Sequence, residues 1–216
     1  MEKFIIIKYI IEFLLFFLLA YLFACIGNIW IQTLYTDNKK LLSFAGKSLY
    51  SKKRIYFITL MMSIIFVRVA FQEDIWLGLL KIFLGYVLIL IIYTDFEQQV
   101  IFDKMIAAVI LGSFFDFLYQ PPVLMDRFMA AIAGGGLFLL LAVLLRGAIG
   151  GGDIKLIFAL GLLLGTERLI LVIVIGILLG AIAALVLLAS KQKKRSDYFA
   201  YGPYFALPAL IFYIVL

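Results

Sequence analysis

The chain has 216 residues, of which 66% are hydrophobic, and its mean hydropathy is +1.17. A soluble domain is about half apolar, so a single core cannot bury this excess and we expect lipid to be the solvent. His is absent and Cys25 is the single cysteine, which excludes a histidine base, a His- or Cys-rich metal site and an internal disulfide. The remaining chemistry belongs to carboxylates, hydroxyls, Tyr, Lys and Arg.

The apolar runs predict an all-α polytopic membrane protein with about eight transmembrane helices. A helix needs about 20 residues, with a range of about 17–25, to cross the hydrocarbon. We expect helices at residues 4–34, 55–72, 75–94, 104–120, 125–146, 153–166, 167–190 and 200–216. The sixth and seventh could be one long helix, but Gly165-Thr166-Glu167-Arg168 indicates a turn between them. We expect a single membrane domain, divided into a first helix with a short basic loop (1–54) and a core (55–216).

The first helix contains a second possible pattern. Residues 22–25, which end at Cys25, resemble a lipoprotein cleavage box. However, Lys8 and Glu12 interrupt the apolar run, which also exceeds the about 7–15 residues of the apolar region of a signal peptide. We therefore expect a membrane helix here, with Cys25 as a packing residue.

The net charge of +6 lies in short loops between apolar runs. This pattern predicts membrane orientation and no nucleic-acid binding, because the charges do not gather on a soluble face. The loop after the first helix and the loop before the last one are basic, with Lys39, Lys40, Lys47, Lys52, Lys53 and Arg54 in the first and Lys191, Lys193, Lys194 and Arg195 in the second. The positive-inside rule makes both loops cytoplasmic. Six crossings separate them, so the two assignments agree, and both termini face outward.

Two aspartates stand beside these apolar runs. Asp95 ends the third predicted helix, and Asp153 begins the sixth after three glycines. Two crossings separate them, so both carboxylates are expected at the cytoplasmic face at similar depth. A carboxylate at the edge of hydrocarbon is expensive, which makes each one a candidate functional residue.

Two facing carboxylates favour acid–base chemistry. They do not both ionise easily, so they share one proton. The ionised group can activate a water, while the protonated one polarises a peptide carbonyl and then protonates the leaving amine. The structural alternatives are that Asp153 is a helix N-cap and that Asp95 is a solvated residue just outside its helix. Asp116, late in the fourth helix, is expected to cap or pair.

Other residues near the aspartates are candidate supporting groups. Gly150, Gly151 and Gly152 permit backbone conformations closed to other residues and are expected to let the backbone come close to an extended substrate. A phosphate-binding loop is not expected, because the Gly-Lys-Ser/Thr ending is missing. Lys155 follows Asp153 and adds positive charge near it. Glu97 and Asp103 either tune Asp95 and bind a basic substrate segment or are solvated loop residues, and Gly202 and Pro203 open the last helix.

Three blocks of this sequence resemble the type IV prepilin peptidases, membrane aspartyl proteases of the GxGD class. Residues 95–103 (DFEQQVIFD) are similar to the family's Asp followed eight residues later by Pro-Asp or Pro-Asn. Residues 150–156 (GGGDIKL) are similar to its Gly-x-Gly-Asp-x-Lys block, and residues 201–204 (YGPY) resemble its late Phe-Gly-Pro-Phe. The order, the spacing and the eight-helix frame agree, so the resemblance covers essentially the whole chain.

The resemblance implies that Asp95 and Asp153 are a catalytic pair in a prokaryotic cytoplasmic membrane. It implies removal of the basic leader from type IV prepilins or pseudopilins at the cytoplasmic face, in the service of pili or secretion. In the family this cut follows a Gly and usually precedes a Phe. Glu97 and Asp103 would then meet basic residues of the leader, and proteolysis would need no cofactor or metal.

The chain departs from the family pattern at two places. Phe102 stands where the family has Pro, which we expect to alter loop stiffness more than chemistry. Many bacterial members also carry a long first loop with four zinc-binding cysteines, a region associated with N-methylation by S-adenosylmethionine. Here that loop, roughly residues 35–54, is short and has no Cys, which puts N-methylation in doubt for this chain.

Three alternatives stay open at this stage. A presenilin-like intramembrane protease would place its aspartates deeper in the helices than Asp95 and Asp153 are expected to lie. A proton-coupled transporter would hold paired carboxylates near the midplane, with a repeated broken-helix pair. A purely structural scaffold would tolerate Asn at both positions.

Overall fold

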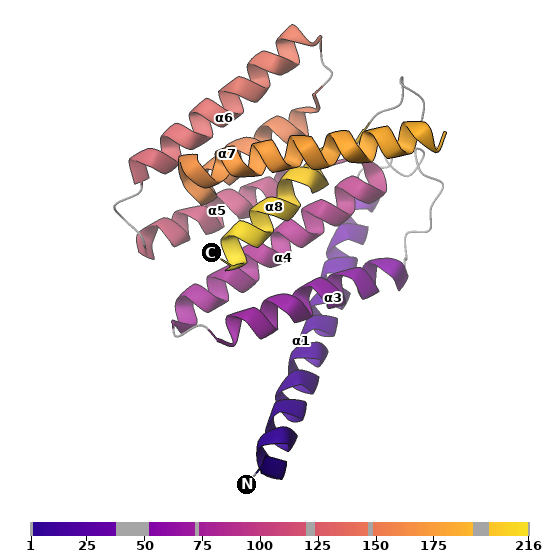
Figure 1. Ribbon diagram of the computed structural model, residues 1–216, viewed down its shortest axis with the longest axis vertical. Helices are drawn as coiled ribbons and strands as arrows, with labels where there is room; N and C mark the ends of the chain where they lie inside the picture. The colour runs from indigo at the N-terminus through magenta and orange to yellow at the C-terminus, as the bar shows by residue number, and fades with distance from the viewer. Residues whose placement is uncertain are drawn as a thin grey trace. The chain divides into compact units, whose positions relative to one another are not determined.

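The computed structural model describes residues 2–37, 52–71, 74–119, 124–146, 149–191 and 199–215, without the side chains of residues 2–10. Across these ranges the chain is all-α, which confirms the predicted fold class (Figure 1). The helices are α1 (Glu2–Asp37), α3 (Lys52–Val69), α4 (Ile75–Gln98), α5 (Asp103–Tyr119), α6 (Leu124–Leu144), α7 (Gly151–Ala189) and α8 (Gly202–Val215).

Helix α7 contains the sixth and seventh predicted segments. It is interrupted at Gly165, where φ is 77° and ψ is 179°. This left-handed φ is one that glycine adopts at little cost, and it falls at the turn predicted for residues 165–168. The first half of α7 (residues 151–164) and its second half (residues 166–189) diverge from this break (Figure 1). The Asp126 carboxylate of α6 accepts a hydrogen bond from the Thr166 backbone N–H at 3.0 Å and so holds the break against α6.

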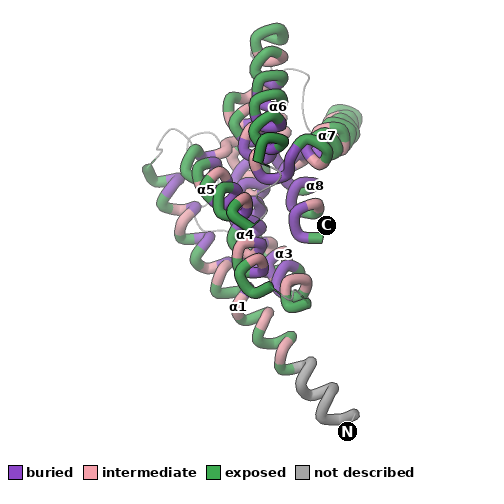
Figure 2. The backbone as a smooth tube through the Cα atoms, turned by 90° about the vertical axis from the view of Figure 1, so that its left-hand side faces the viewer, coloured by how far each residue is buried: buried purple, intermediate pink, exposed green. Residues whose placement is uncertain are grey.

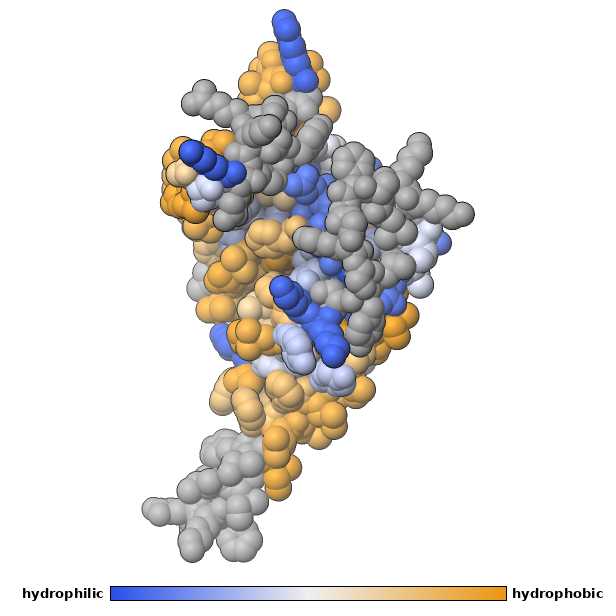
Figure 3. All heavy atoms as spheres, turned by 90° about the vertical axis from the view of Figure 1, so that its right-hand side faces the viewer, coloured by the Kyte–Doolittle hydropathy of each residue, from blue (hydrophilic) through white to orange (hydrophobic). Residues whose placement is uncertain are grey.

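The described helices have the length and surface of a multi-pass membrane protein. Four stretches are long and apolar enough to cross a bilayer, namely Ile11–Asp37, Ile75–Gln98, Leu124–Leu144 and Gly151–Ala189. Large apolar side chains are exposed along them. Figure 2 shows exposed residues along the helices, and Figure 3 shows apolar surface over large parts of its view. Water would make such a surface unfavourable, so lipid is the solvent that fits it. The eight crossings and the outward termini stay predictions, because most basic loop residues lie outside the described residues.

The chain packs as two compact units, residues 1–86 and 87–216, with the boundary inside α4. The predicted division after residue 54 stays a prediction. In the first unit α1 packs on α3. The buried Arg54 donates to the Asn28 side-chain oxygen at 3.0 Å and lies 5.3 Å from the Tyr35 ring centroid. The Tyr86 hydroxyl donates to the Phe23 carbonyl at 3.0 Å.

In the second unit α7 packs against α5, α6 and α8. Helices α6 and α7 approach closely at Gly161, where a Cβ would stand 2.6 Å from the Ala131 backbone. Small residues at such a crossing let two membrane helices approach closely. Gly134 of α6 makes a second close contact, since a Cβ there would stand 2.7 Å from Leu169 of α7.

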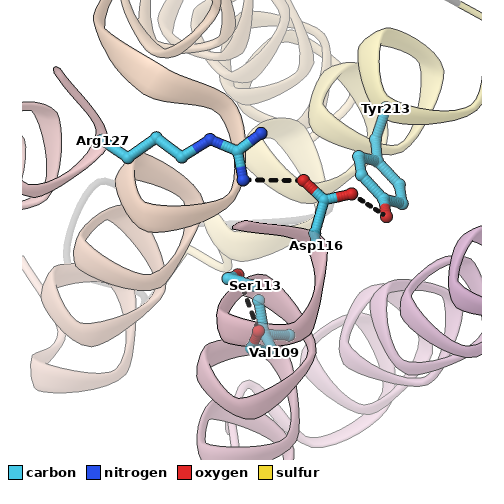
Figure 4. A network of polar contacts seen from close by, with 5 residues as sticks. All are labelled: Val109, Ser113, Asp116, Arg127 and Tyr213. Atoms are coloured by element: carbon cyan, nitrogen blue, oxygen red, sulfur yellow. Dashed lines mark hydrogen bonds and ion pairs between the residues drawn. The ribbon is translucent and has the colours of Figure 1, made fainter. Parts of the chain in front are cut away.

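A buried polar network joins three helices of this unit, as Figure 4 shows. Asp116 of α5 accepts from Arg127 of α6 at 2.7 Å and from the Tyr213 hydroxyl of α8 at 3.0 Å. All three side chains are buried, so the carboxylate is compensated by a charge and a hydroxyl. The predicted pairing of Asp116 is confirmed, and its partners tie the end of α8 to α5 and α6.

Candidate active site

Asp95 lies inside α4, three residues before the helix ends at Gln98, and is only 4% exposed. The alternative of a solvated residue outside its helix is therefore wrong. The helix extends beyond the predicted end at residue 94, because the Gln99 backbone N–H still bonds to the Asp95 carbonyl at 2.9 Å. Gln99 then adopts a left-handed φ of 56°, as residues that end a helix commonly do. This turn directs residues 100–102 back toward the start of α7.

Asp153 is the third residue of α7 and is 9% exposed. The N-cap position is occupied by Gly150, whose carbonyl accepts from the backbone N–H of Asp153 at 3.1 Å and of Ile154 at 3.3 Å. The alternative that Asp153 is the N-cap is therefore wrong. From this third helical position its carboxylate reaches back to the backbone of the N-cap residue Gly150 and accepts a hydrogen bond from it.

The three glycines before Asp153 do not owe their presence to unusual backbone angles. Gly150 has φ −67° and ψ 141°, and Gly165 is the one glycine of the described residues with a positive φ. That part of the prediction is wrong, because extended and helical angles are open to any residue. The three glycines differ in the room that they leave for a Cβ atom. A Cβ on Gly150 would lie 3.2 Å from the Asp153 carboxylate, and a Cβ on Gly152 would lie 3.1 Å from Ile101. A Cβ on Gly151 would contact nothing within 4 Å.

The start of α8 closes the other side of Asp95. A Cβ on Gly202 would stand 2.6 Å from Asp95 Oδ2 and 2.8 Å from Ile101 Cδ1. Ile101 therefore lies between Gly152 of α7 and Gly202 of α8, and it joins the two glycine motifs around the aspartates. Side chains of the protein itself lie close to Gly150, Gly152 and Gly202, and the approach of a substrate to the glycines stays a prediction. Pro203 follows in the first turn of α8 and is buried, a position that suits proline.

The structure brings Asp95 and Asp153 close enough to interact electrostatically. They come from α4 and from the first half of α7, and both are buried. Asp95 Oδ2 makes no hydrogen bond within the described part of the chain. The Gly202 backbone also interacts with this carboxylate, and a second carboxylate lies within electrostatic range, which is the arrangement that acid–base chemistry at a shared water needs.

Of the other predicted residues, Asp103 and Lys155 form an ion pair, whereas Glu97 lies apart on α4. Asp103 is the first residue of α5, and its carboxylate accepts from Lys155 Nζ at 2.6 Å. Both side chains are exposed, so this ion pair contributes little stability. Glu97 lies in the last turn of α4 and is half-buried. Asp103 and Lys155 therefore form an exposed polar pair that joins the start of α5 to the first turn of α7.

Sequence reasoning missed two features of this region. Ile101 was treated as a residue between two acidic positions, and no local pattern marks its contacts with Gly152 and Gly202. An aromatic group also adjoins Asp95: the exposed Phe96 ring lies 6.0 Å from Tyr204, which stacks on Phe199 at 5.4 Å. The sequence signal was the run of aromatic residues that flanks Gly202.

Comparison with known proteins identifies related sequences. Residues 82–185, which include Asp95 and Asp153, match the family described as the type IV leader peptidase family. The chain is 35% identical over 153 residues to a prepilin leader peptidase/N-methyltransferase of Neisseria gonorrhoeae, covering 68% of this chain and 52% of that protein. It is 30% identical over 145 residues to a protein of the same name from Aeromonas salmonicida strain A449, covering 63% and 49%. The chain spans about half the length of these relatives, and no solved structure matches it.

Proposed function

Because the chain belongs to the type IV leader peptidase family, we propose that it is a membrane aspartyl endopeptidase that removes the basic leader from type IV prepilins or pseudopilins. Asp95 and Asp153 would carry out the hydrolysis. The observation that carries this proposal is the juxtaposition of two buried, interacting carboxylates, one of which has an oxygen without a hydrogen bond in the described part of the chain. The names of the relatives support the substrate class.

The chemistry follows from the pair. Two adjacent carboxylates hold one proton between them, so one is a base and the other an acid. The base removes a proton from a water as the water oxygen attacks the scissile carbonyl carbon. The acid donates its proton to the carbonyl oxygen, which forms a tetrahedral diol. Collapse of the diol breaks the C–N bond, the amine leaves with a proton, and the pair again holds a single proton. The two carboxylates and one water molecule supply every group that these reaction steps need.

The position of the pair favours a cut at the membrane edge. Asp95 lies in the last turn of α4 and Asp153 in the first turn of α7. In the eight-crossing arrangement with outward termini, both turns face the cytoplasm, where the positive-inside rule also keeps a basic leader. A presenilin-like enzyme would need these carboxylates farther inside the helices.

N-methylation of the new N-terminus is not part of the proposed function. The relatives carry both activities in their names, but this chain has a short first loop without cysteines. That loop lies largely outside the described residues. We propose that the chain performs the peptidase step alone and uses no S-adenosylmethionine.

The test is cleavage of a prepilin precursor by detergent-purified protein, with Asp95→Asn and Asp153→Asn as nearly isosteric variants. Glu167→Gln is the matched control, because Glu167 is an exposed carboxylate on α7 outside the site. We expect cleavage by wild type and by Glu167→Gln, and none by either Asp variant, with all four proteins sharing one thermal unfolding midpoint. Cleavage that survives either Asp substitution would refute the carboxylate mechanism.

A further inference from the structure

A continuous apolar groove runs over the first half of α7, between α5 and α6. Two cavities of about 530 and 280 Å³ form it, and they share Ile110 and Phe158. Both α5 and α6 pack on α7, whose Phe158 contributes to the floor. Several lining residues, including Ile132 and Leu139, are exposed, so this α5–α6 groove opens at the surface of the protein.

Polar pairs mark the two ends of the α5–α6 groove. At one end Lys155 bonds to Asp103, and Lys155 is two residues from Asp153. At the other end Arg127 lines the groove and bonds to Asp116. Asp103 and Asp116 lie about 20 Å apart along α5, at a rise of about 1.5 Å per residue. The groove therefore begins within the first turn of α7, the turn that carries Asp153, and follows a large part of the about 30 Å hydrocarbon thickness.

Three small residues lie among the large apolar residues that line the larger cavity. Ala107, Gly135 and Gly136 line it, and a Cβ on Gly136 would contact nothing within 4 Å. Membrane helices pair through such small residues, because the two backbones can approach closely and pack by van der Waals contact. An apolar helix fits these features better than a lipid chain, since its length, its close approach and a polar boundary at the cytoplasmic end all match.

We propose that the α5–α6 groove binds the apolar helix of the membrane-anchored precursor, immediately beyond the bond that Asp95 and Asp153 cut. This inference rests on the proposed function. A precursor cut at the membrane edge keeps its apolar segment in the bilayer, so that segment must lie close to the pair while the bond is cleaved. A helix in the groove ends beside Lys155 and Asp103, and the chain that continues from it reaches Asp153 in a few residues. The groove thus selects precursors by the apolar helix and not by the leader alone.

The first test fills the groove. Gly136→Leu places a side chain into space that is open, while Leu137→Phe is the matched control, because Leu137 is a half-exposed neighbour that does not line the groove. The substrates are a full precursor in detergent and a soluble peptide with the cleavage site but without the apolar helix. We expect Gly136→Leu to lower kcat/KM for the full precursor by about tenfold or more, mainly by raising KM. The kcat/KM for the soluble peptide should stay unchanged. Equal rates of Gly136→Leu and Leu137→Phe on the precursor would overturn the inference.

The second test measures occupancy without cleavage. Leu139→Cys in the groove and Leu137→Cys outside it are compared in a background of Cys25→Ser and Asp95→Asn, with single cysteines along the apolar helix of the precursor. We expect disulfide cross-links from position 139 and few from position 137. Equal cross-linking at both positions would overturn the inference, as would cross-linking of position 139 to a second copy of the chain in the presence of precursor.

The two proposals fail differently. If wild type cuts neither the precursor nor the peptide, the proposed function fails. If wild type cuts the precursor, but Gly136→Leu cuts it equally well and position 139 does not cross-link, only the α5–α6 groove assignment fails.

Discussion

Gly202 offers a quantitative test of how closely the structure positions Asp95. An alanine Cβ at this position would stand 2.6 Å from Asp95 Oδ2 and 2.8 Å from Ile101 Cδ1. Ordinary van der Waals contact begins at 3.4 Å, so the carboxylate must retreat or α8 must move away. Gly202 has no positive φ, so the substitution Gly202→Ala introduces no backbone strain. Gly202→Ala therefore displaces the carboxylate of Asp95 relative to the rest of the site.

The expected effect is a loss of rate with little loss of stability. A misplacement of about 1 Å at a reacting group costs about a hundredfold in rate, so we expect Gly202→Ala to lower kcat for precursor cleavage by about two orders of magnitude. The measurement is initial-rate cleavage of a detergent-solubilised precursor, with the thermal unfolding midpoint of each protein as a measure of folding.

Gly151→Ala is the matched control for Gly202→Ala. It makes the same chemical change two residues before Asp153, but its Cβ would contact nothing within 4 Å. We expect its kcat to stay within about twofold of wild type, and Gly150→Ala, with a Cβ 3.2 Å from the Asp153 carboxylate, to fall between the two. Equal activity of Gly202→Ala and Gly151→Ala would show that the contact at Asp95 does not govern the reaction.

Three other predictions concern packing and product. Removing the hydroxyl with Tyr213→Phe leaves Asp116 bound to Arg127 and should cost about 1–3 kcal/mol of unfolding free energy. Asp116→Ala leaves a buried Arg127 without its carboxylate and should cost about 3–5 kcal/mol. Denaturant unfolding in detergent compares the two variants, and equal losses would contradict the network. Gly161→Ala should lower the thermal unfolding midpoint, with overpacking of about 1–3 kcal/mol, while Gly136→Ala should not; similar midpoints would contradict the close approach of α6 and α7. Mass spectrometry of the cleaved precursor should find an unmethylated N-terminus with S-adenosylmethionine present, and a methylated product would refute the single-activity proposal.

Much of the molecule follows from the sequence without tertiary information. Excess hydrophobicity requires a lipid solvent, and in lipid the backbone must satisfy its own hydrogen bonds. The apolar runs are continuous and of helix length, so the all-α class follows from their pattern. The break in α7 was readable because Gly165 is followed by polar residues in an otherwise apolar run. The motif residues 95–103 and 150–156 identified the family, and the charge of the loops predicts that Asp95 and Asp153 share one face.

The tertiary structure decided which side chains surround those motifs. Gly202 is far from Asp95 in sequence, yet it lies against that carboxylate, and Ile101 joins it to Gly152. Such contacts depend on how helices cross, and no local period or propensity encodes a crossing. For the same reason the sequence led to an explanation of the glycines by backbone angles, whereas the structure explains Gly202 and Gly152 by lack of space. Local pattern determines where a helix begins and that a carboxylate stands at its end, but the packing of distant helices determines what that carboxylate touches.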